Sequence, residues 1–244
     1  MATETKTRPA FYALASGGWR DYLTLLHAPY TAWHLSYVVI GAALSTEFSW
    51  SRVVPALVAF FLAVGIGAHA LDELRGRPLQ TRIPRSVLIA LAVLSIAGAV
   101  AIGLVGAVAV DPWIGAFVAA GAFIVVAYNL ELVGGRFHGD FWFALAWGAF
   151  PLLTGYFAVA EELDPIAVTA AAFAFALSHA QRTLSSRVRE VRRRVDRVSG
   201  TVEHRDGSSH ELTADDLMDV EERALRILSL AVVALAAALV MMRL

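Results

Sequence analysis

The residues best suited to chemistry lie at the end of one apolar stretch, in the run His69-Ala-Leu-Asp72-Glu73. On a helix these three ionisable residues occupy positions i, i+3 and i+4, so they share one face. Carboxylate oxygens suit Mg²⁺, and the arginines that follow, Arg75 and Arg77, suit a diphosphate by charge and bidentate geometry. The alternative is a salt-bridged helix end, in which a carboxylate of this run pairs with one of these arginines.

Two further apolar stretches end in polar residues of the same kind. One ends in Tyr128-Asn129-Leu-Glu131 and the other in Ser178-His179-Ala-Gln181-Arg182. Ionisable residues within a membrane are costly, which makes each of them a functional candidate. The sequence therefore predicts a cavity at one membrane face, surrounded by His69, Asp72, Glu73, Asn129, Glu131, His179 and Arg182.

Membrane helices must position these residues, because 58% of the 244 residues are hydrophobic and only 17% are charged. A soluble domain averages about 25% charged residues. Runs of about 20 apolar residues predict membrane spans. The fold class is therefore an all-α, polytopic membrane bundle of about seven transmembrane helices, at about 30–46, 53–72, 86–109, 112–130, 141–160, 165–183 and 224–243.

The basic residues predict the orientation of this bundle. With the N-terminus inside and the C-terminus outside, 18 of the 20 lysines and arginines fall on the cytoplasmic side, and only Arg52 and Arg243 do not. We therefore expect a multi-pass protein of the prokaryotic cytoplasmic membrane. The chain has no cysteine, which excludes disulfides and thiolate metal sites.

The chain divides into four segments: a polar and interfacial stretch with an amphipathic helix (1–29), a six-helix bundle (30–187), a basic cytoplasmic insertion (188–222) and a seventh membrane helix (223–244). Asp206-Gly207 in an alternating strip predicts a β-hairpin at 200–213. Thr213 and Asp216 predict a helix-capping box. The basic stretch suits anionic lipid, whereas the lack of an aromatic platform argues against nucleic acid as a partner.

Three stretches between about residues 23 and 181 resemble the UbiA family of intramembrane prenyltransferases. LTLLHAPYTAWHLSYVVIGAAL is similar to the first helix of that family, and AVGIGAHALDELRGRPLQTRIP to the segment with its first aspartate motif. AYNLELVGGRFHGDFWFALAWGAFPLLTGYFA is similar to its fourth helix, basic loop and Gly-Phe-Pro helix. The resemblance implies a shortened UbiA-type fold, in which Mg²⁺ helps an isoprenyl diphosphate to react with a small lipophilic acceptor.

The resemblance also implies roles for individual residues. Asp72 matches an aspartate of the first motif, and Arg77 matches the arginine of Arg-Pro-Leu. The implied catalytic residues are His69, Asp72 and His179. The implied metal ligands are Asp72, Glu73 and Glu131, and the implied aromatic lining of the apolar chamber is Tyr128, Trp147, Phe150 and Tyr156. The implied diphosphate-binding residues are Arg75, Arg77, Arg82, Arg136, Arg182, Tyr128 and Asn129.

The chain departs from the family pattern at both aspartate motifs. Ala68 and His69 stand where the family has Asn-Asp, and SHAQRTLSS replaces the second motif. These differences support a second hypothesis, a non-catalytic lipid-binding, transport or complex-assembly subunit with the same fold. A third hypothesis is a membrane terpene cyclase, which uses the same cation chemistry without an acceptor.

Overall fold

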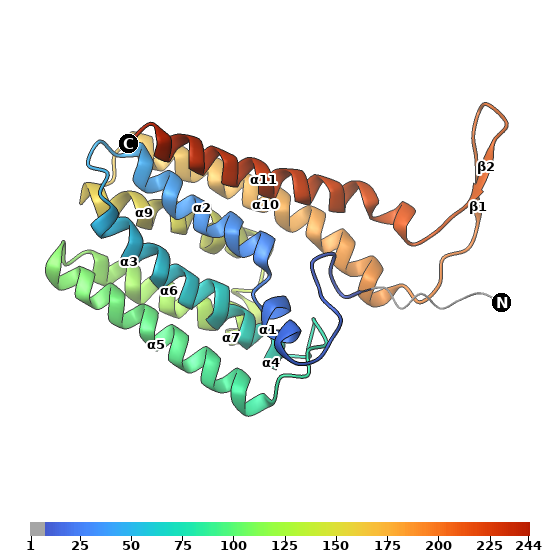
Figure 1. Ribbon diagram of the computed structural model, residues 1–244, viewed down its shortest axis with the longest axis horizontal. Coiled ribbons are helices and arrows are strands. Elements are labelled where there is room, and N and C mark those ends of the chain that lie inside the picture. Colours follow the sequence, from blue (N-terminus) through green and yellow to red (C-terminus); the bar gives the residue numbers. More distant parts are fainter. Residues whose placement is uncertain (1–7) are drawn as a thin grey trace.

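The computed structural model describes residues 8–244, and the regular secondary structure of this part of the chain is helical apart from one two-stranded hairpin (Figure 1). Each of the seven apolar segments predicted from the sequence coincides with a helix or with helices that continue one another. In chain order the principal helices are α2 (Ala28–Leu44), α3 (Trp50–Phe60) with η1 (Phe61–Ala68) and α4 (His69–Leu74), α5 (Arg85–Ala109), α6 (Ile114–Asn129), α8 (Asp140–Ala144) with η2 (Leu145–Ala149) and α9 (Phe150–Ala160), α10 (Pro165–Arg194) and α11 (Asp219–Met241).

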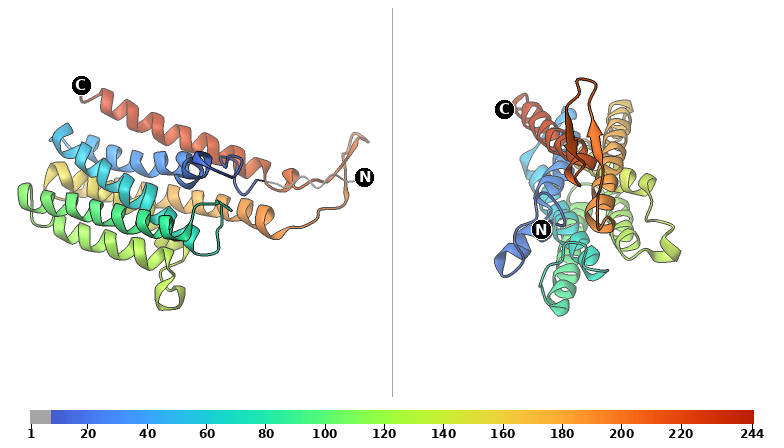
Figure 2. Two further views of the ribbon diagram at one scale, coloured as in Figure 1. Left: turned by 60° about the horizontal axis from the view of Figure 1, so that its bottom comes forward. Right: turned by 90° about the vertical axis from the view of Figure 1, so that its right-hand side faces the viewer.

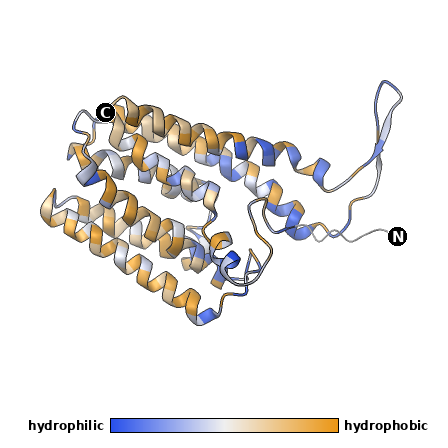
Figure 3. Cartoon of the chain, in the orientation of Figure 1, coloured by the Kyte–Doolittle hydropathy of each residue, from blue (hydrophilic) through white to orange (hydrophobic). Residues whose placement is uncertain are grey.

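Four of these helical stretches are long and apolar enough to cross a membrane, so the chain is a multi-pass membrane protein. They run over Trp50–Leu74, Arg85–Ala109, Asp140–Ala160 and Asp219–Met241. Helix α6 is apolar but shorter, α2 has 17 residues, and α10 becomes polar toward its C-terminal end. Figure 3 shows this pattern, with apolar helices through most of the bundle and hydrophilic residues gathered at the end from which the hairpin extends.

Close helix contacts hold the middle of the bundle together. Helices α2 and α9 pack backbone to backbone, because a Cβ atom at Gly41 would collide with the carbonyl oxygen of Leu152. A Cβ atom at Gly155 would likewise collide with the carbonyl oxygen of Val38. Small residues are the usual means of close helix approach in lipid.

Two π-helical turns, η1 and η2, interrupt the helices that carry the polar residues. Their widened turns accompany side-chain hydrogen bonds to backbone carbonyls. Nδ1 of His69 lies 3.1 Å from the carbonyl oxygen of Gly65, and Nδ1 of His34 in α2 lies 2.8 Å from that of Trp147. Segments of this kind occur frequently at functional sites.

The insertion between α10 and α11 contains the predicted hairpin. Strand β1 (Thr201–Glu203) pairs antiparallel with β2 (Ser209–Glu211), which confirms the prediction, and Figure 2 shows the hairpin standing off the ends of the two helices. The capping box is also confirmed: the backbone N–H of Thr213 donates to Asp216 at 2.7 Å, and that of Asp216 donates to the Thr213 hydroxyl at 3.4 Å. It opens a 3₁₀ turn, η3 (Asp215–Leu217), which leads into α11.

The interfacial amphipathic helix expected over FYALASGGWRDYLTLL, residues 11–26, is only partly formed. Only α1 (Trp19–Leu25) is helical, because Gly17 and Gly18 adopt positive φ angles of 123° and 63° that end the helical path. Residues 9–12 fold instead toward the polar end of the bundle, where they border a cavity.

Candidate functional site

A polar cavity of about 230 Å³ lies at the arginine-rich end of the bundle. Its walls come from the start of α2, from α4, from the end of α6, from α8 and η2, and from α10, while residues 9–12 border its mouth. The cavity thus brings together residues that are far apart in the sequence. The sequence predicts such a cavity because several apolar stretches end in polar residues.

Four histidines line this polar cavity: His27, His34, His69 and His138. The last three place Nδ1 within 2.8–3.1 Å of a backbone carbonyl oxygen. Because a carbonyl only accepts, each Nδ1 carries the proton, and each Nε2 of a neutral ring is left as an acceptor. Such a nitrogen can take a proton from a bound molecule.

His27 adds a second imidazole beside His69. The two rings stack with centroids 3.9 Å apart and planes 13° apart. The backbone of His27 is left-handed (φ 46°, ψ 46°), a conformation that is uncommon for residues other than glycine. Burial and the adjacent His69 hold the pKa of His27 well below its ordinary 6.5, so the ring is neutral.

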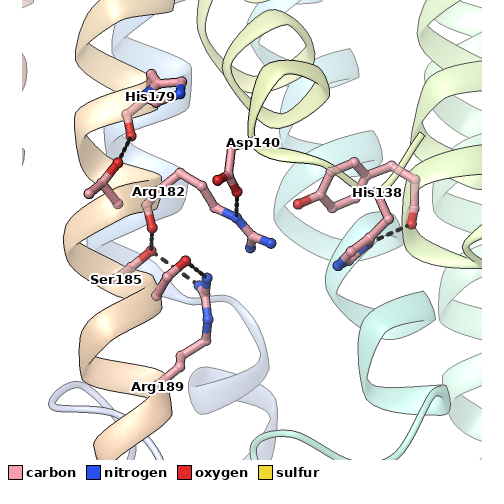
Figure 4. A network of polar contacts seen from close by, with 9 residues as sticks. His138, Asp140, His179, Arg182, Ser185 and Arg189 are labelled. Atoms are coloured by element: carbon pink, nitrogen blue, oxygen red, sulfur yellow. Dashed lines mark hydrogen bonds and ion pairs between the residues drawn. The ribbon is translucent and has the colours of Figure 1, made fainter. Parts of the chain in front are cut away.

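Three arginines on one face of α10 line the opposite wall: Arg182, Arg189 and Arg193. Nε of Arg182 donates to Asp140 at 3.0 Å, and its guanidinium lies 5.5 Å from the ring centre of Phe143. The Arg189 guanidinium donates to the hydroxyls of Ser185 and Ser186 at 3.1 and 2.9 Å (Figure 4). The wall is therefore strongly cationic.

Three buried polar atoms on the walls of this cavity lack a hydrogen-bond partner in the described part of the chain. They are Nε2 of His27, the hydroxyl of Tyr128 and Oε1 of Gln181. Tyr128 is 5% exposed and Gln181 is 2% exposed. Buried polar groups are almost always paired, so three orphans around one cavity indicate that it accommodates a polar ligand or water.

A separate apolar chamber of about 510 Å³ lies between α3, η1, α5, α6 and α9. Trp147 lines both spaces, which makes them neighbours. Phe117, Phe150 and Phe157 line the chamber together with glycines and alanines of α5 and α6. Of the aromatic residues implied for this lining, Trp147 and Phe150 lie here, Tyr128 lines the polar cavity, and Tyr156 lines neither space.

The structure brings together six of the residues named from the sequence. The polar cavity is lined by His69, Asp72, Tyr128, Asn129, Trp147 and Arg182. The remaining candidates lie outside it, for reasons that differ from one residue to the next.

Glu73 shares the helix end with Asp72 but serves the following loop. Its side chain is fully buried, and its carboxylate accepts hydrogen bonds from the backbone N–H of Leu79 and from the backbone N–H and hydroxyl of Thr81, at 2.8–3.0 Å. The Arg77 guanidinium donates hydrogen bonds to the carbonyl oxygens of Thr81 and Ile83 in the same loop, at 2.7 and 2.9 Å. Both residues are therefore positioned as loop supports, and not as the metal or diphosphate ligands expected from the sequence.

Arg75 pairs with Glu131, and not with Asp72 or Glu73 as the alternative interpretation expects. Their side chains meet at 2.7 Å, and Arg75 also donates to the carbonyl of Leu130 at 2.6 Å. The contact ties the end of α4 to the end of α6 at the surface. Neither residue reaches the polar cavity.

The other expected ligands, Arg82, Arg136 and His179, are exposed and also lie outside the polar cavity. Each residue of a helix is rotated by about 100° from the one before it, so three residues make about 300°. His179 therefore lies about 60° around α10 from Arg182. That angle leaves His179 exposed, whereas Arg182 reaches Asp140 (Figure 4).

These positions decide whether the expected Mg²⁺ fits. Of the three implied ligands, only Asp72 lines the polar cavity, since Glu73 and Glu131 are engaged elsewhere. Among residues 8–244, no three histidine, aspartate or glutamate side chains are arranged to hold a metal ion. The residues present therefore do not fit a carboxylate-held Mg²⁺.

Comparison with known proteins adds no assignment. No protein-family model matches the chain, and no curated protein or solved structure matches it. The resemblance to the UbiA family thus rests on the sequence motifs alone, and the site is interpreted from its own residues.

Sequence reasoning missed several members of the site, namely His27, His34, His138, Gln181, Arg189 and Arg193. The two arginines follow Arg182 by 7 and 11 residues, which places all three within about 40° on one helical face. This spacing is visible in the sequence. The position of His27 is not, because it depends on a left-handed residue just before α2.

Proposed function

We propose that the protein acts on an isoprenyl diphosphate as a prenyltransferase-like enzyme of the prokaryotic cytoplasmic membrane. The proposal includes seven transmembrane helices with the N-terminus inside, a shortened UbiA-type arrangement and a polar cavity open to the cytoplasm. The distribution of arginines supports this orientation, since 18 of the 20 basic residues then lie inside.

One observation carries the proposal: a cationic polar cavity and an apolar chamber are neighbours that share Trp147 as a lining residue. A ligand that suits both needs an anionic head and a long apolar tail. An isoprenyl diphosphate has both, and a chamber of about 510 Å³ falls within the usual size of ligand sites.

The same residues could support transfer of the isoprenyl group. The bond between the allylic carbon and the diphosphate oxygen breaks, and its electron pair leaves with the diphosphate. The ring of Trp147, which lines both spaces, would stabilise the allylic cation. The acceptor then forms a bond to that carbon, and its proton passes to Nε2 of His69.

Binding tests the substrate class with a variant that fills the chamber. Ala122 lines the chamber, whereas Ala120 on the same helix is exposed. We expect Ala122→Phe to weaken farnesyl diphosphate binding to the detergent-solubilised protein, measured by calorimetry, by at least about tenfold. Ala120→Phe should leave binding unchanged. Equal affinity in both variants would refute the proposed place of the tail.

A second candidate function is non-catalytic binding of the same kind of lipid. The engagement of Glu73 and Glu131 away from the cavity favours it, because the family's metal-assisted departure of diphosphate loses its ligands. Release of pyrophosphate, followed with an enzymatic assay in the presence of quinone and phenol acceptors, separates the two. Release that depends on His69 supports transfer, whereas tight binding without any release supports the second candidate.

A further inference from the structure

We infer that the arginine face of α10, formed by Arg182, Arg189 and Arg193, binds the phosphate groups of the ligand directly and without a metal ion. This inference rests on the proposed function and adds how the head group is recognised. It replaces the carboxylate-held Mg²⁺ expected from the family resemblance, which the residues of this cavity do not fit.

The spacing of the three arginines suits an extended head group. At about 1.5 Å per residue, Arg189 and Arg193 are about 6 Å apart along the helix axis, and Arg182 lies about 10 Å from Arg189. Arg182 contacts Phe143, whose ring stacks on Trp147 with centroids 5.6 Å apart. Arg182 therefore lies on the chamber side of the cavity and Arg193 is exposed near the end of α10, which orders the ligand from tail to terminal phosphate.

The charges of this face are incompletely balanced. Arg182 pairs with Asp140, but among residues 8–244 no carboxylate lies within ion-pairing distance of Arg189 or Arg193. Burial and the two neighbouring arginines lower the pKa of Arg189 to about 10. A bound phosphate would compensate the unpaired charge, and guanidinium groups match its oxygens bidentately.

Hydroxyl groups complete the anion site. The Tyr128 hydroxyl is buried without a partner in the described chain and can donate to a phosphate oxygen. At the mouth, burial and Tyr30 raise the pKa of Tyr12 above its ordinary value, so this phenol also remains a donor. The cavity thus offers donors around an anion, and among residues 8–244 Asp72 is the one carboxylate that lines it.

The test measures binding of inorganic pyrophosphate and of farnesyl diphosphate by calorimetry, in excess EDTA and again in Mg²⁺. We expect both to bind the intact, detergent-solubilised protein in EDTA. Arg189→Gln and Arg193→Gln should each weaken binding by about 10- to 100-fold, the value of one charge-assisted hydrogen bond. Arg194→Gln removes the same charge from the same helix but away from the cavity, and it should change affinity less than about twofold.

Two results would overturn the inference: binding of both ligands only when Mg²⁺ is present, or equal weakening by Arg194→Gln, which would indicate diffuse attraction. Inorganic phosphate provides a further arm, since weaker binding of phosphate than of pyrophosphate supports contact with two phosphate groups. If a glutamine variant fails to fold by circular dichroism, Arg189→Lys retains the charge and should still weaken binding through loss of bidentate contact.

The same experiment distinguishes this inference from the proposed function. Pyrophosphate binding in EDTA with no gain from the farnesyl chain would uphold the arginine site but reject the isoprenyl ligand. A strong gain from the chain with an absolute need for Mg²⁺ would reject metal-free recognition and leave the isoprenyl ligand supported.

Discussion

Replacement of Glu73 by alanine is expected to destabilise the fold strongly, although the sequence pattern places this residue in a metal site. The buried carboxylate accepts three hydrogen bonds from Leu79 and Thr81. Hydrogen bonds to a charged group contribute about 1.5–3 kcal/mol each, and the substitution leaves two buried backbone N–H groups unpaired. Allowing for entry of water, we expect the free energy of unfolding to fall by about 4 kcal/mol.

The assay is denaturant unfolding in mixed micelles, followed by circular dichroism. Glu131→Ala is the matched control, because Glu131 was assigned to the same metal but forms a surface pair with Arg75 that should contribute less than about 1 kcal/mol. The destabilisation by Glu73→Gln should lie between those of Glu73→Ala and Glu131→Ala. The glutamine amide oxygen still accepts hydrogen bonds, but its NH₂ group faces at least one backbone N–H, which is also a donor. Wild-type stability of Glu73→Ala, together with loss of a stabilisation by Mg²⁺ seen in the parent protein, would refute the loop role.

Three further predictions concern packing, ion pairing and titration. Gly155→Ala should cost about 2–3 kcal/mol of unfolding free energy through collision with α2, whereas Gly115→Ala, with only an ordinary contact to Ala107, should be neutral or stabilising. Glu222→Ala should lower the free energy of unfolding by about 2–3 kcal/mol, because it leaves Arg192 buried without its partner. Glu190 is exposed, so Glu190→Ala should change the unfolding free energy little in the same assay. Hydrogen bonds from Thr213 hold the pKa of Asp216 below its ordinary 3.8. The capping box is therefore stable above pH 3.8 and weakens as the pH falls through the pKa of Asp216 in the folded state. Thr213→Ala should raise the pKa of Asp216 measured by NMR, and an unchanged pKa would contradict the capping contact.

The helices and the hairpin were predictable because their determinants are local. Runs of apolar residues set the positions of the helices, and Asp206-Gly207 set the turn between β1 and β2. The failure at the N-terminal interfacial helix is also local, since Gly17 and Gly18 stand within the apolar pattern and end it.

The site was only partly predictable because side-chain direction depends on tertiary contacts. Asp72 and Glu73 are adjacent, so about 100° of helical rotation separates their side chains. Asp72 lines the cavity, whereas Glu73 accepts hydrogen bonds from the following loop. The donors of that loop cannot be inferred from the spacing of the carboxylates. For Arg189 and Arg193 the spacing was informative, but basic neighbours on every face of α10 made the stretch resemble a lipid-binding segment.

The most direct test of the account is to locate the tail of a bound ligand. A farnesyl diphosphate analogue with a photoreactive diazirine at the end of its chain would be bound to the protein, irradiated and mapped by mass spectrometry. The account predicts adducts on chamber-lining residues such as Phe117 and Val118, which excess pyrophosphate suppresses. Adducts confined to lipid-facing positions such as Val108 and Leu230, unaffected by pyrophosphate, would contradict it.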